Sequence, residues 1–312
     1  MDQKETIYVL GAGAIGFPLA AHLTHAGKTA VAVRTSRDDV PKGTSNVTVY
    51  TGANSISLPV ETISLSKLTK LEGTIVITTK SYTNTAIAQE LKDKAAASPI
   101  VIMQNGIGVE KPFLDAGFSQ IYRCILYVTS QATNGSIFTF RPVTASPIGI
   151  VIGHESGLRQ CIDDLNTDGF PFRAEANIQR ETWKKAIINT VFNSICPLLD
   201  VDNGVFVRDA VTADLAREVV RECVMLMERL DIGLSEHELM DQIRLISQRS
   251  DGQLISTLQD LRSGRPTEIA FLNLEIARVA AALQPSLQLP RVEFLGNMIV
   301  AKSLQQHRHG FS

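Results

Sequence analysis

The sequence predicts a chain of two domains, an α/β domain over residues 1–177 and an all-helical domain over residues 178–312. Short apolar runs typical of strands alternate with helical patterns up to about Asn177, and beyond that point only helical periodicity is found. A strand-rich part followed by a part that contains only helices is typical of two separate domains. A length of 312 residues fits two domains, each able to bury a core.

The composition is that of an ordinary globular protein, with 44% hydrophobic residues, 20% charged residues and a net charge of -2. Because no broad basic surface is indicated, we expect neither nucleic acid nor a membrane as a partner. The N-terminus has no signal-peptide pattern and no apolar run is long enough to span a membrane, so we expect a cytoplasmic protein. Four widely spaced cysteines match no metal or redox motif; we expect buried thiols and no metal site.

A glycine-rich segment separates the first strand from the first helix. The expected elements are a strand at Ile7–Leu10, a helix at Phe17–Ala26 and a strand at Ala30–Val33. In a Rossmann-type dinucleotide site, Gly11 would allow the tight turn, Gly13 the approach of a pyrophosphate and Gly16 the packing of helix on sheet. A chance glycine-rich turn is the alternative, but the position between strand and helix favours a cofactor site. The expected cofactor contacts are Gly11, Ala12, Gly13, Ala14, Ile15 and Gly16.

The end of the second strand indicates which dinucleotide binds. An NAD site usually has an acidic residue there for the ribose 2′-hydroxyl, whereas an NADP site has cations and hydroxyls for the 2′-phosphate. The chain reads R-T-S-R from Arg34 to Arg37, and Asp38 and Asp39 follow only after both arginines. Because a guanidinium can donate two bonds to one phosphate, we favour NADPH, with Arg34 as a ligand. A solvated polar turn is the alternative.

Polar side chains follow two further strands of the first domain. Ile75–Thr79 is expected to be a buried strand ending at Lys80, and Ile100–Met103 a second one followed by Asn105. A helix over Thr85–Ala97 would connect them, as in a parallel pair. Since open α/β sheets bind ligands at the carboxyl ends of their strands, we expect Lys80 and Asn105 at the site. For Lys80, a solvated strand end is the alternative.

The remaining elements follow from the same patterns. Further strands are expected at Thr48–Pro59, Tyr122–Ser130, Ile137–Phe140, Pro147–Gly153 and Pro171–Ala174, with a helix at about Ser156–Leu165. The first of these is either a hairpin or an excursion from the sheet, and the Asn134-Gly135 turn makes the second and third antiparallel. The second domain is expected to contain helices at 179–196, 209–230, 235–249, 254–262, 267–283 and 289–306.

The first helix of the second domain carries a ladder of polar residues. Lys185, Asn189 and Asn193 lie at positions i, i+4 and i+8, so they share one face. Nearly every other residue from Trp183 to Pro197 is apolar, so the helix is expected to be buried. Buried polar groups need partners, and the ladder makes sense if it faces a ligand in a cleft between the domains.

With the glycine motif, the strand-end lysine, Q-N-G at Gln104–Gly106 and W-x-K-x-x-x-N-x-x-x-N from Trp183, the chain resembles the ketopantoate reductase family (2-dehydropantoate 2-reductases) nearly end to end. The resemblance implies an α/β cofactor domain, a helical substrate domain and reduction of an α-keto acid by NADPH, within pantothenate biosynthesis. Lys185 matches the family's catalytic lysine. Lys184 is not its counterpart because it lies about 100° away around the helix.

The resemblance also implies the other site residues. Glu268 matches a glutamate that would orient the lysine or hold hydroxyls of the cofactor or substrate. The implied substrate-binding residues are Asn105, Lys185, Asn189, Asn193, Asn203 and Ser256. Besides the glycine turn and Arg34, the implied cofactor-binding residues are Lys80, Asn105, Ala132 and Glu268.

The chemistry of ketone reduction agrees with these residue types. Hydride addition develops negative charge on the ketone oxygen, so the site must supply a hydrogen-bond donor and a proton there. Lys185 is the candidate general acid. Asn189 and Asn193 would hold the substrate's hydroxyl and carbonyl, and Ser256 would donate to its carboxylate.

The chain departs from the family pattern at several positions. Thr83 replaces a glutamine, Gln131 stands before Ala132 where many members have a histidine, and Ala270 and Leu274 replace an aspartate and a glycine. These departures leave the exact 2-oxo acid open. The alternatives are a reductase of another 2-oxo acid, a related opine or hydroxy-acid dehydrogenase, and a non-catalytic NADP(H)-sensing protein. The helical domain has enough apolar surface for a homodimer.

Overall fold

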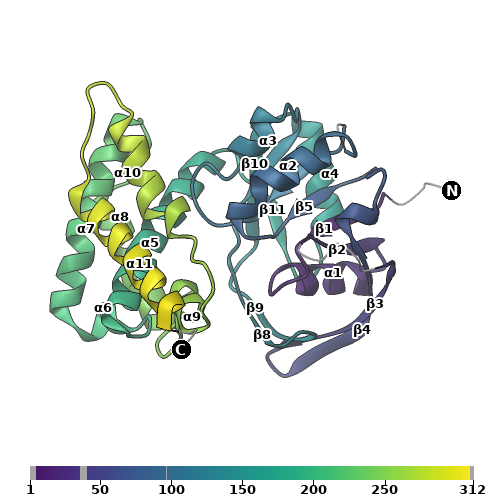
Figure 1. Ribbon diagram of the computed structural model, residues 1–312, viewed down its shortest axis with the longest axis horizontal. Helices are drawn as coiled ribbons and strands as arrows, with labels where there is room; N and C mark the ends of the chain where they lie inside the picture. Colours follow the sequence, from purple (N-terminus) through teal and green to yellow (C-terminus); the bar gives the residue numbers. More distant parts are fainter. Residues whose placement is uncertain (1–4, 36–40, 96, 310–312) are drawn as a thin grey trace. The chain divides into compact units, whose positions relative to one another are not determined.

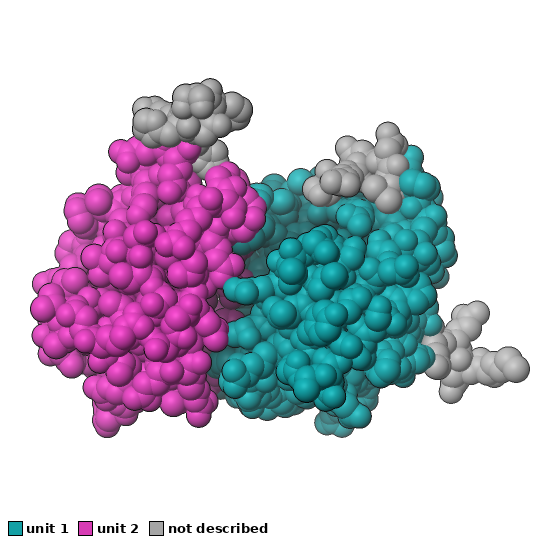
Figure 2. Space-filling view, turned by 90° about the horizontal axis from the view of Figure 1, so that it is seen from below, with its two compact units in different colours: residues 1–104, 109–178 teal, residues 105–108, 179–312 magenta. Residues whose placement is uncertain are grey.

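The computed structural model describes residues 5–35, 41–95 and 97–309. The chain divides into two compact units (Figure 2), one made of Met1–Gln104 and Val109–Ile178 and the other of Asn105–Gly108 and Gln179–Ser312. The main boundary follows Ile178, one residue beyond the boundary expected from the sequence. The sequence did not indicate that Asn105–Gly108 belongs with the helical unit.

In the described part of the first unit, eleven strands form one sheet (Figure 1). In chain order the strands are β1 (Ile7–Leu10), β2 (Ala30–Arg34), β3 (Gly43–Thr51), β4 (Asn54–Ser64), β5 (Ile75–Ile77), β6 (Ile100–Ile102), β7 (Ile121–Cys124), β8 (Val128–Asn134), β9 (Ile137–Pro142), β10 (Ser146–Ile152) and β11 (Phe172–Ala174). Their order across the sheet is β11-β10-β7-β6-β5-β1-β2-β4-β3-β9-β8. Neighbours from β4 through β2, β1, β5 and β6 to β7 pair in parallel, which is the strand order of a doubly wound Rossmann sheet.

Helices cover the sheet and explain why its central strands are apolar throughout. The helical elements of the first unit are α1 (Gly16–His25), η1 (Leu65–Lys67), η2 (Ser81–Thr83), α2 (Asn84–Lys92), α3 (Lys111–Asp115) and α4 (Glu155–Leu165). The side chains of β5 and β6 are all buried, as expected for parallel strands that are covered on both faces. The α/β class expected for this part of the chain is confirmed.

Two expectations about the strands need correction or completion. Tyr122–Ser130 was expected to be one strand, but it is the end of β7 followed by β8. Only β8 pairs antiparallel with β9; β7 pairs in parallel with β6, because its fully buried side chains suit the centre of the sheet. The segment Thr48–Pro59 is a hairpin of β3 and β4, and β4 continues as a strand parallel to β2.

The second unit is helical, as expected. Its elements are α5 (Ile178–Leu199), α6 (Val205–Arg208), α7 (Ala210–Arg229), α8 (Glu236–Arg249), α9 (Ser256–Arg262), η3 (Ile269–Phe271), α10 (Asn273–Ala281) and α11 (Pro290–His309). The prediction of a single helix at 267–283 is wrong, because the helical conformation is interrupted at Leu272 between η3 and α10. The Phe271 carbonyl instead accepts the Ile107 N–H at 2.8 Å. None of the described helices is both long enough and apolar enough to cross a membrane.

Helix α5 supplies much of the core of the helical unit. Its side chains Trp183, Ile187, Val191 and Phe192 are all buried, and they pack in one cluster with residues of α7 and α8. A helix with so many buried positions has few places for polar groups, so those it carries are expected to have specific partners.

The four cysteines are buried thiols. Burial raises the pKa of Cys161 and of Cys196 to about 12, so both stay protonated near neutral pH and are poor nucleophiles. Each cysteine belongs to the hydrophobic core of its unit. Their expected role as small core residues is confirmed.

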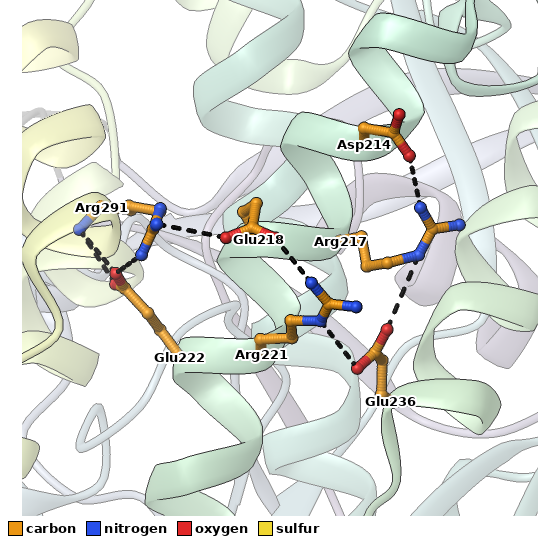
Figure 3. Close-up of polar contacts among 7 residues, drawn as sticks. All are labelled: Asp214, Arg217, Glu218, Arg221, Glu222, Glu236 and Arg291. Carbon is orange, nitrogen blue, oxygen red and sulfur yellow. Dashed lines mark hydrogen bonds and ion pairs between the residues drawn. The ribbon is translucent and has the colours of Figure 1, made fainter.

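A chain of ion pairs joins α7 to the first turns of α8 and α11 (Figure 3). It consists of the pairs Asp214–Arg217, Arg217–Glu236, Glu236–Arg221, Arg221–Glu218, Glu218–Arg291 and Arg291–Glu222. Glu222 differs from the others because it is buried and its carboxylate also accepts the backbone N–H groups of Arg291 at 2.9 Å and Val292 at 3.0 Å. It thereby caps the N-terminus of α11 from a neighbouring helix.

We expect Glu222→Ala to lower the free energy of unfolding by about 2–3 kcal/mol, because two backbone donors lose a charged acceptor. Chemical denaturation followed by circular dichroism measures this change. Asp214→Ala is the matched control: it removes a carboxylate of the same network that is 70% exposed, and it should leave stability nearly unchanged. Equal effects of the two substitutions would contradict the capping role.

Candidate active site

The glycine turn after β1 has a conformation that only glycine satisfies at two positions. Gly11 has φ of 115°, and a Cβ there would lie 2.7 Å from Thr78 Oγ1. A Cβ at Gly16 would lie 1.8 Å from the Gly11 carbonyl oxygen. The turn and the packing of α1 against the sheet therefore both exclude a side chain, as the motif predicted.

The same turn presents backbone donors at the start of α1. The N–H groups of Ala12, Gly13, Ala14 and Ile15 donate to no acceptor within the described residues. No acidic residue lies in the first turn of α1, and no side chain caps it. A helix N-terminus with open N–H groups and no negative charge fits the pyrophosphate of a dinucleotide.

Arg34 lies at the last position of β2, as expected. Its guanidinium carbon is 5.6 Å from the centre of the Phe17 ring, and its Nε is buried without a hydrogen-bond partner among the described residues. A cation held over an aromatic ring has restricted freedom and is ready to bind an anion. Arg37, Asp38 and Asp39 lie outside the described residues.

Lys80 and Asn105 follow neighbouring parallel strands, which confirms their expected placement. Ile77 of β5 pairs with Ile102 of β6, and each polar residue comes three positions later. Leu10, just before the glycine turn, pairs with Ile77 as well. The glycine turn and Lys80 therefore lie at the same edge of the sheet. Asn105 follows β6 in the chain and belongs to the other unit.

A buried amide pair, not anticipated from the sequence, supports this edge. Asn84 and Gln104 exchange two side-chain hydrogen bonds, each 2.7 Å long. Gln104 Nε2 also donates to the Thr79 carbonyl at 2.8 Å, and the Arg123 guanidinium donates to the Gln104 carbonyl at 2.6 Å. The residues that directly precede Lys80 and Asn105 are thus tied to one another. The only sequence signal was a glutamine immediately before Asn105.

Ala132 lies on β8 and is exposed. Ser130, two positions earlier and therefore on the same face of the strand, donates its hydroxyl to the Ala14 carbonyl of the glycine turn. This contact shows that β8 reaches the glycine turn. The cofactor contact of Ala132 stays a prediction.

In the helical unit, Asn193 brings three of the expected substrate residues together. It is buried, and its Nδ2 donates to the Asn189 carbonyl at 3.0 Å. Its Oδ1 accepts from Ser256 Oγ at 3.2 Å and from the Thr257 N–H at 3.3 Å, at the first turn of α9. Asn189 and Asn193 of α5 and Ser256 of α9 therefore form one polar cluster.

Asn203 lies close to the segment that leads into α9. Its N–H donates to the Gln253 carbonyl at 2.9 Å, and its carbonyl accepts from Ser247 Oγ at 2.7 Å. Its side-chain oxygen is buried without a partner among the described residues, so a donor from a ligand would satisfy it. Next to it, hydrogen bonding by Arg208 lowers the pKa of Asp202 to about 2, and the ionised carboxylate accepts the Gly204 N–H at 2.7 Å.

The two adjacent lysines of α5 differ in their surroundings. Lys184 forms an ion pair with Glu238 at 3.1 Å, and Arg180 contacts the same carboxylate at 2.6 Å. Lys185 is partly buried on the face that carries Asn189 and Asn193. Lys184 therefore has a structural partner within its unit. The catalytic role of Lys185 stays a prediction, as does that of Glu268, which directly precedes η3.

Two departures from the family pattern are explained by local contacts. Leu274 lies against Gly296 of α11, where an added Cβ would be 2.7 Å from Leu274 Cδ2, so the larger residue occupies space left by a glycine. Thr83 donates its hydroxyl to the Lys80 carbonyl at 2.7 Å and so holds the turn after β5. Leu274 therefore contributes to helix packing, and Thr83 stabilises a turn.

We expect Gly13→Ala to weaken binding of the nicotinamide dinucleotide at least tenfold, about 1.4 kcal/mol, without loss of stability. A Cβ at Gly13 would meet no protein atom within 4 Å, so only a closely bound pyrophosphate would oppose it. Gly135→Ala, at a similarly open glycine in the β8–β9 turn, is the control. Fluorescence titration with NADPH and with NADH measures affinity, and thermal unfolding measures stability. Unchanged affinity for both dinucleotides in Gly13→Ala would contradict binding at this turn.

Comparisons with known proteins agree over nearly the whole chain. The family model Ketopantoate reductase PanE/ApbA matches residues 7–145, and the model of its C terminal part matches residues 177–303. The chain is 28% identical to a 2-dehydropantoate 2-reductase of Pyrococcus horikoshii, over 95% of this chain and 97% of that protein. It is 24% identical to a 2-dehydropantoate 2-reductase of Archaeoglobus fulgidus, over 88% of this chain and 90% of that protein.

Solved structures share the fold at lower identity. A dimeric ketopantoate reductase from Staphylococcus aureus has a TM-score of 0.81 and 20% identity, over 96% of this chain and 99% of its own. A D-mandelate dehydrogenase with NADH and anilino(oxo)acetate has a TM-score of 0.83 and 19% identity, over the same shares. Since the family models together match most of both units, the chain belongs to the ketopantoate reductase family of oxidoreductases.

Proposed function

We propose that this protein reduces 2-dehydropantoate to pantoate with NADPH, and that Lys185 is the general acid. The observation that carries the proposal is the cluster in which Asn193 binds both the Asn189 carbonyl and Ser256. Asn189 and Asn193 lie on the same face of α5 as Lys185, and Ser256 contacts Asn193 directly. The name of the curated relatives, 2-dehydropantoate 2-reductase, supports the choice of substrate.

Each of the proposed site residues has a separate role in the reduction of a ketone. The bound nicotinamide supplies the hydride. Lys185 donates the proton to the oxygen on which negative charge develops. Asn193 has one N–H left after its bond to Asn189, and Asn189 has its own carboxamide, so both can hold the hydroxyl and carbonyl of the substrate. Ser256 is exposed and its hydroxyl can turn to donate to a carboxylate.

The proposed cofactor-binding residues lie in the first unit. The open N–H groups at the start of α1 hold the pyrophosphate, and Ala132 and Lys80 line the cofactor. Arg34, stacked on Phe17, binds the 2′-phosphate and favours NADPH over NADH. Glu268 orients Lys185 or holds hydroxyl groups of the cofactor or substrate, and Asn105 contacts the substrate and the nicotinamide.

The experiment that tests the proposal is a panel of 2-oxo acids, including 2-dehydropantoate, assayed separately with NADPH and NADH. We expect the highest kcat/KM with 2-dehydropantoate and NADPH. Turnover of a different 2-oxo acid alone would replace the substrate and keep the reaction class. Cofactor binding without turnover of any 2-oxo acid would identify a sensing protein. A strong preference for NADH would contradict the role of Arg34.

We expect Lys185→Met to lower kcat by about a hundred- to ten-thousandfold, because the proton donor is lost while the aliphatic stem is kept. Lys184→Met is the matched control one position away; it removes only the ion pair with Glu238 and should keep kcat within about twofold of the wild type. Steady-state assays and circular dichroism measure activity and fold. Equal losses in both variants would rule out Lys185 as the specific acid.

A homodimer through the helical unit also belongs to the proposal. Val211 and Leu215 of α7 and Phe294 and Met298 of α11 are all exposed, which supports an apolar contact surface. Light scattering on the purified protein decides between the chain mass of 34.0 kDa and twice that mass.

A further inference from the structure

We propose that Thr78 and Ser130 are positioning residues that aim the backbone N–H groups of the glycine turn at the cofactor, and so set dinucleotide affinity. Neither residue belongs to the glycine motif, and neither is expected to touch the cofactor. The inference rests on the cofactor site of the proposed function. Its evidence is a pair of hydroxyl contacts to two different carbonyls of the turn.

Thr78 holds the first part of the turn. It follows β5, and its Oγ1 is 3.0 Å from both the Leu10 and the Gly11 carbonyl oxygens, so one hydroxyl proton is shared between them. A Cβ at either Gly11 or Gly16 would lie only 2.7 Å from the same oxygen, which is too close for an ordinary contact. The absence of a side chain at these two glycines therefore lets the threonine hydroxyl approach the turn.

Ser130 holds the second part of the turn from another strand. It lies on β8, at one edge of the sheet, and its Oγ donates to the Ala14 carbonyl. Ala14 is separated from Ser130 by more than a hundred residues, so only the folded sheet brings the two together. The turn is thus held from β5 at Gly11 and from β8 at Ala14.

Planarity of the peptide bond transmits these contacts to the donors. In a trans peptide the C=O and the following N–H point in opposite directions. Fixing the Gly11 carbonyl therefore fixes the Ala12 N–H, and fixing the Ala14 carbonyl fixes the Ile15 N–H. Both N–H groups point away from the hydroxyls, and neither has an acceptor within the described residues. Donors that are already oriented bind an anion without the entropy cost of ordering them.

The strand pairing does not depend on the Thr78 hydroxyl. The backbone N–H of Thr78 donates to the Leu10 carbonyl at 2.8 Å by itself. Thr78→Val keeps the shape of the side chain and this backbone bond, and it removes the hydroxyl partner of the Gly11 carbonyl. A loss of cofactor affinity in that variant would follow from orientation of the turn rather than from unfolding.

The test compares Thr78→Val, Thr78→Ser and Ser130→Ala in the full chain, with the Kd for NADPH measured by fluorescence titration. We expect Kd to rise about threefold to tenfold in Thr78→Val and in Ser130→Ala, the effect of losing one hydrogen bond, and to return to the wild-type value in Thr78→Ser. With saturating NADPH, kcat and the KM for the 2-oxo acid should stay unchanged, which separates positioning from a general structural defect.

Thr74→Val is the matched control. Thr74 directly precedes the same strand β5, is buried, and donates its hydroxyl to Asp164 at 2.6 Å. It lies at the opposite end of the strand from the turn, so its loss should lower thermal stability and leave the Kd for NADPH unchanged.

The outcomes separate this inference from the proposed function. If the wild-type protein binds NADPH and the Thr78→Val and Ser130→Ala variants bind it equally well, the positioning role is wrong and the cofactor site stands. If Thr74→Val weakens binding as much as Thr78→Val, the effect is general and the positioning role is again wrong. If the wild-type protein binds neither NADPH nor NADH, the cofactor site itself is wrong.

Discussion

The helical unit depends on the burial of α5. A helix that is apolar around most of its circumference must lie inside its unit, and every polar residue on it then needs a partner. Asn193 meets this requirement by accepting from the first turn of α9 and donating to its own helix. The same bonds fix where Ser256 lies. A requirement of burial therefore also assembles the polar cluster that we assign to the substrate.

The first unit shows the complementary arrangement, in which backbone groups rather than side chains form the site. Two carbonyls of the glycine turn, those of Gly11 and Ala14, accept hydroxyls, while the four N–H groups from Ala12 to Ile15 are left without acceptors among the described residues. This division gives the turn a definite electrostatic direction, with donors open on one side. A side chain at Gly11 or Gly16 would meet the Thr78 hydroxyl, so this arrangement requires glycine at both positions.

The departures from the family pattern fall into two groups. Leu274 and Thr83 have partners within their own units, Gly296 in one case and the Lys80 carbonyl in the other, so they change packing without removing a proposed reacting group. Gln131 and Ala270 are exposed, and no contact of theirs within the described part of the chain explains the change.

Local sequence patterns were enough to predict the fold class, the glycine turn, the strand-end positions of Lys80 and Asn105, and the ladder on α5, because each depends on local periodicity or on a backbone conformation that only glycine adopts. Other features depend on residues that are far apart in the sequence, and local patterns do not contain them. Three features depend on partners that are distant in the sequence. They are the division of Tyr122–Ser130 into β7 and β8, the interruption of the helix at Leu272, and the hydroxyl contacts of Thr78 and Ser130. Likewise, the ion pair of Lys184 with Glu238 joins two helices that are far apart in the sequence, so no local pattern contains it.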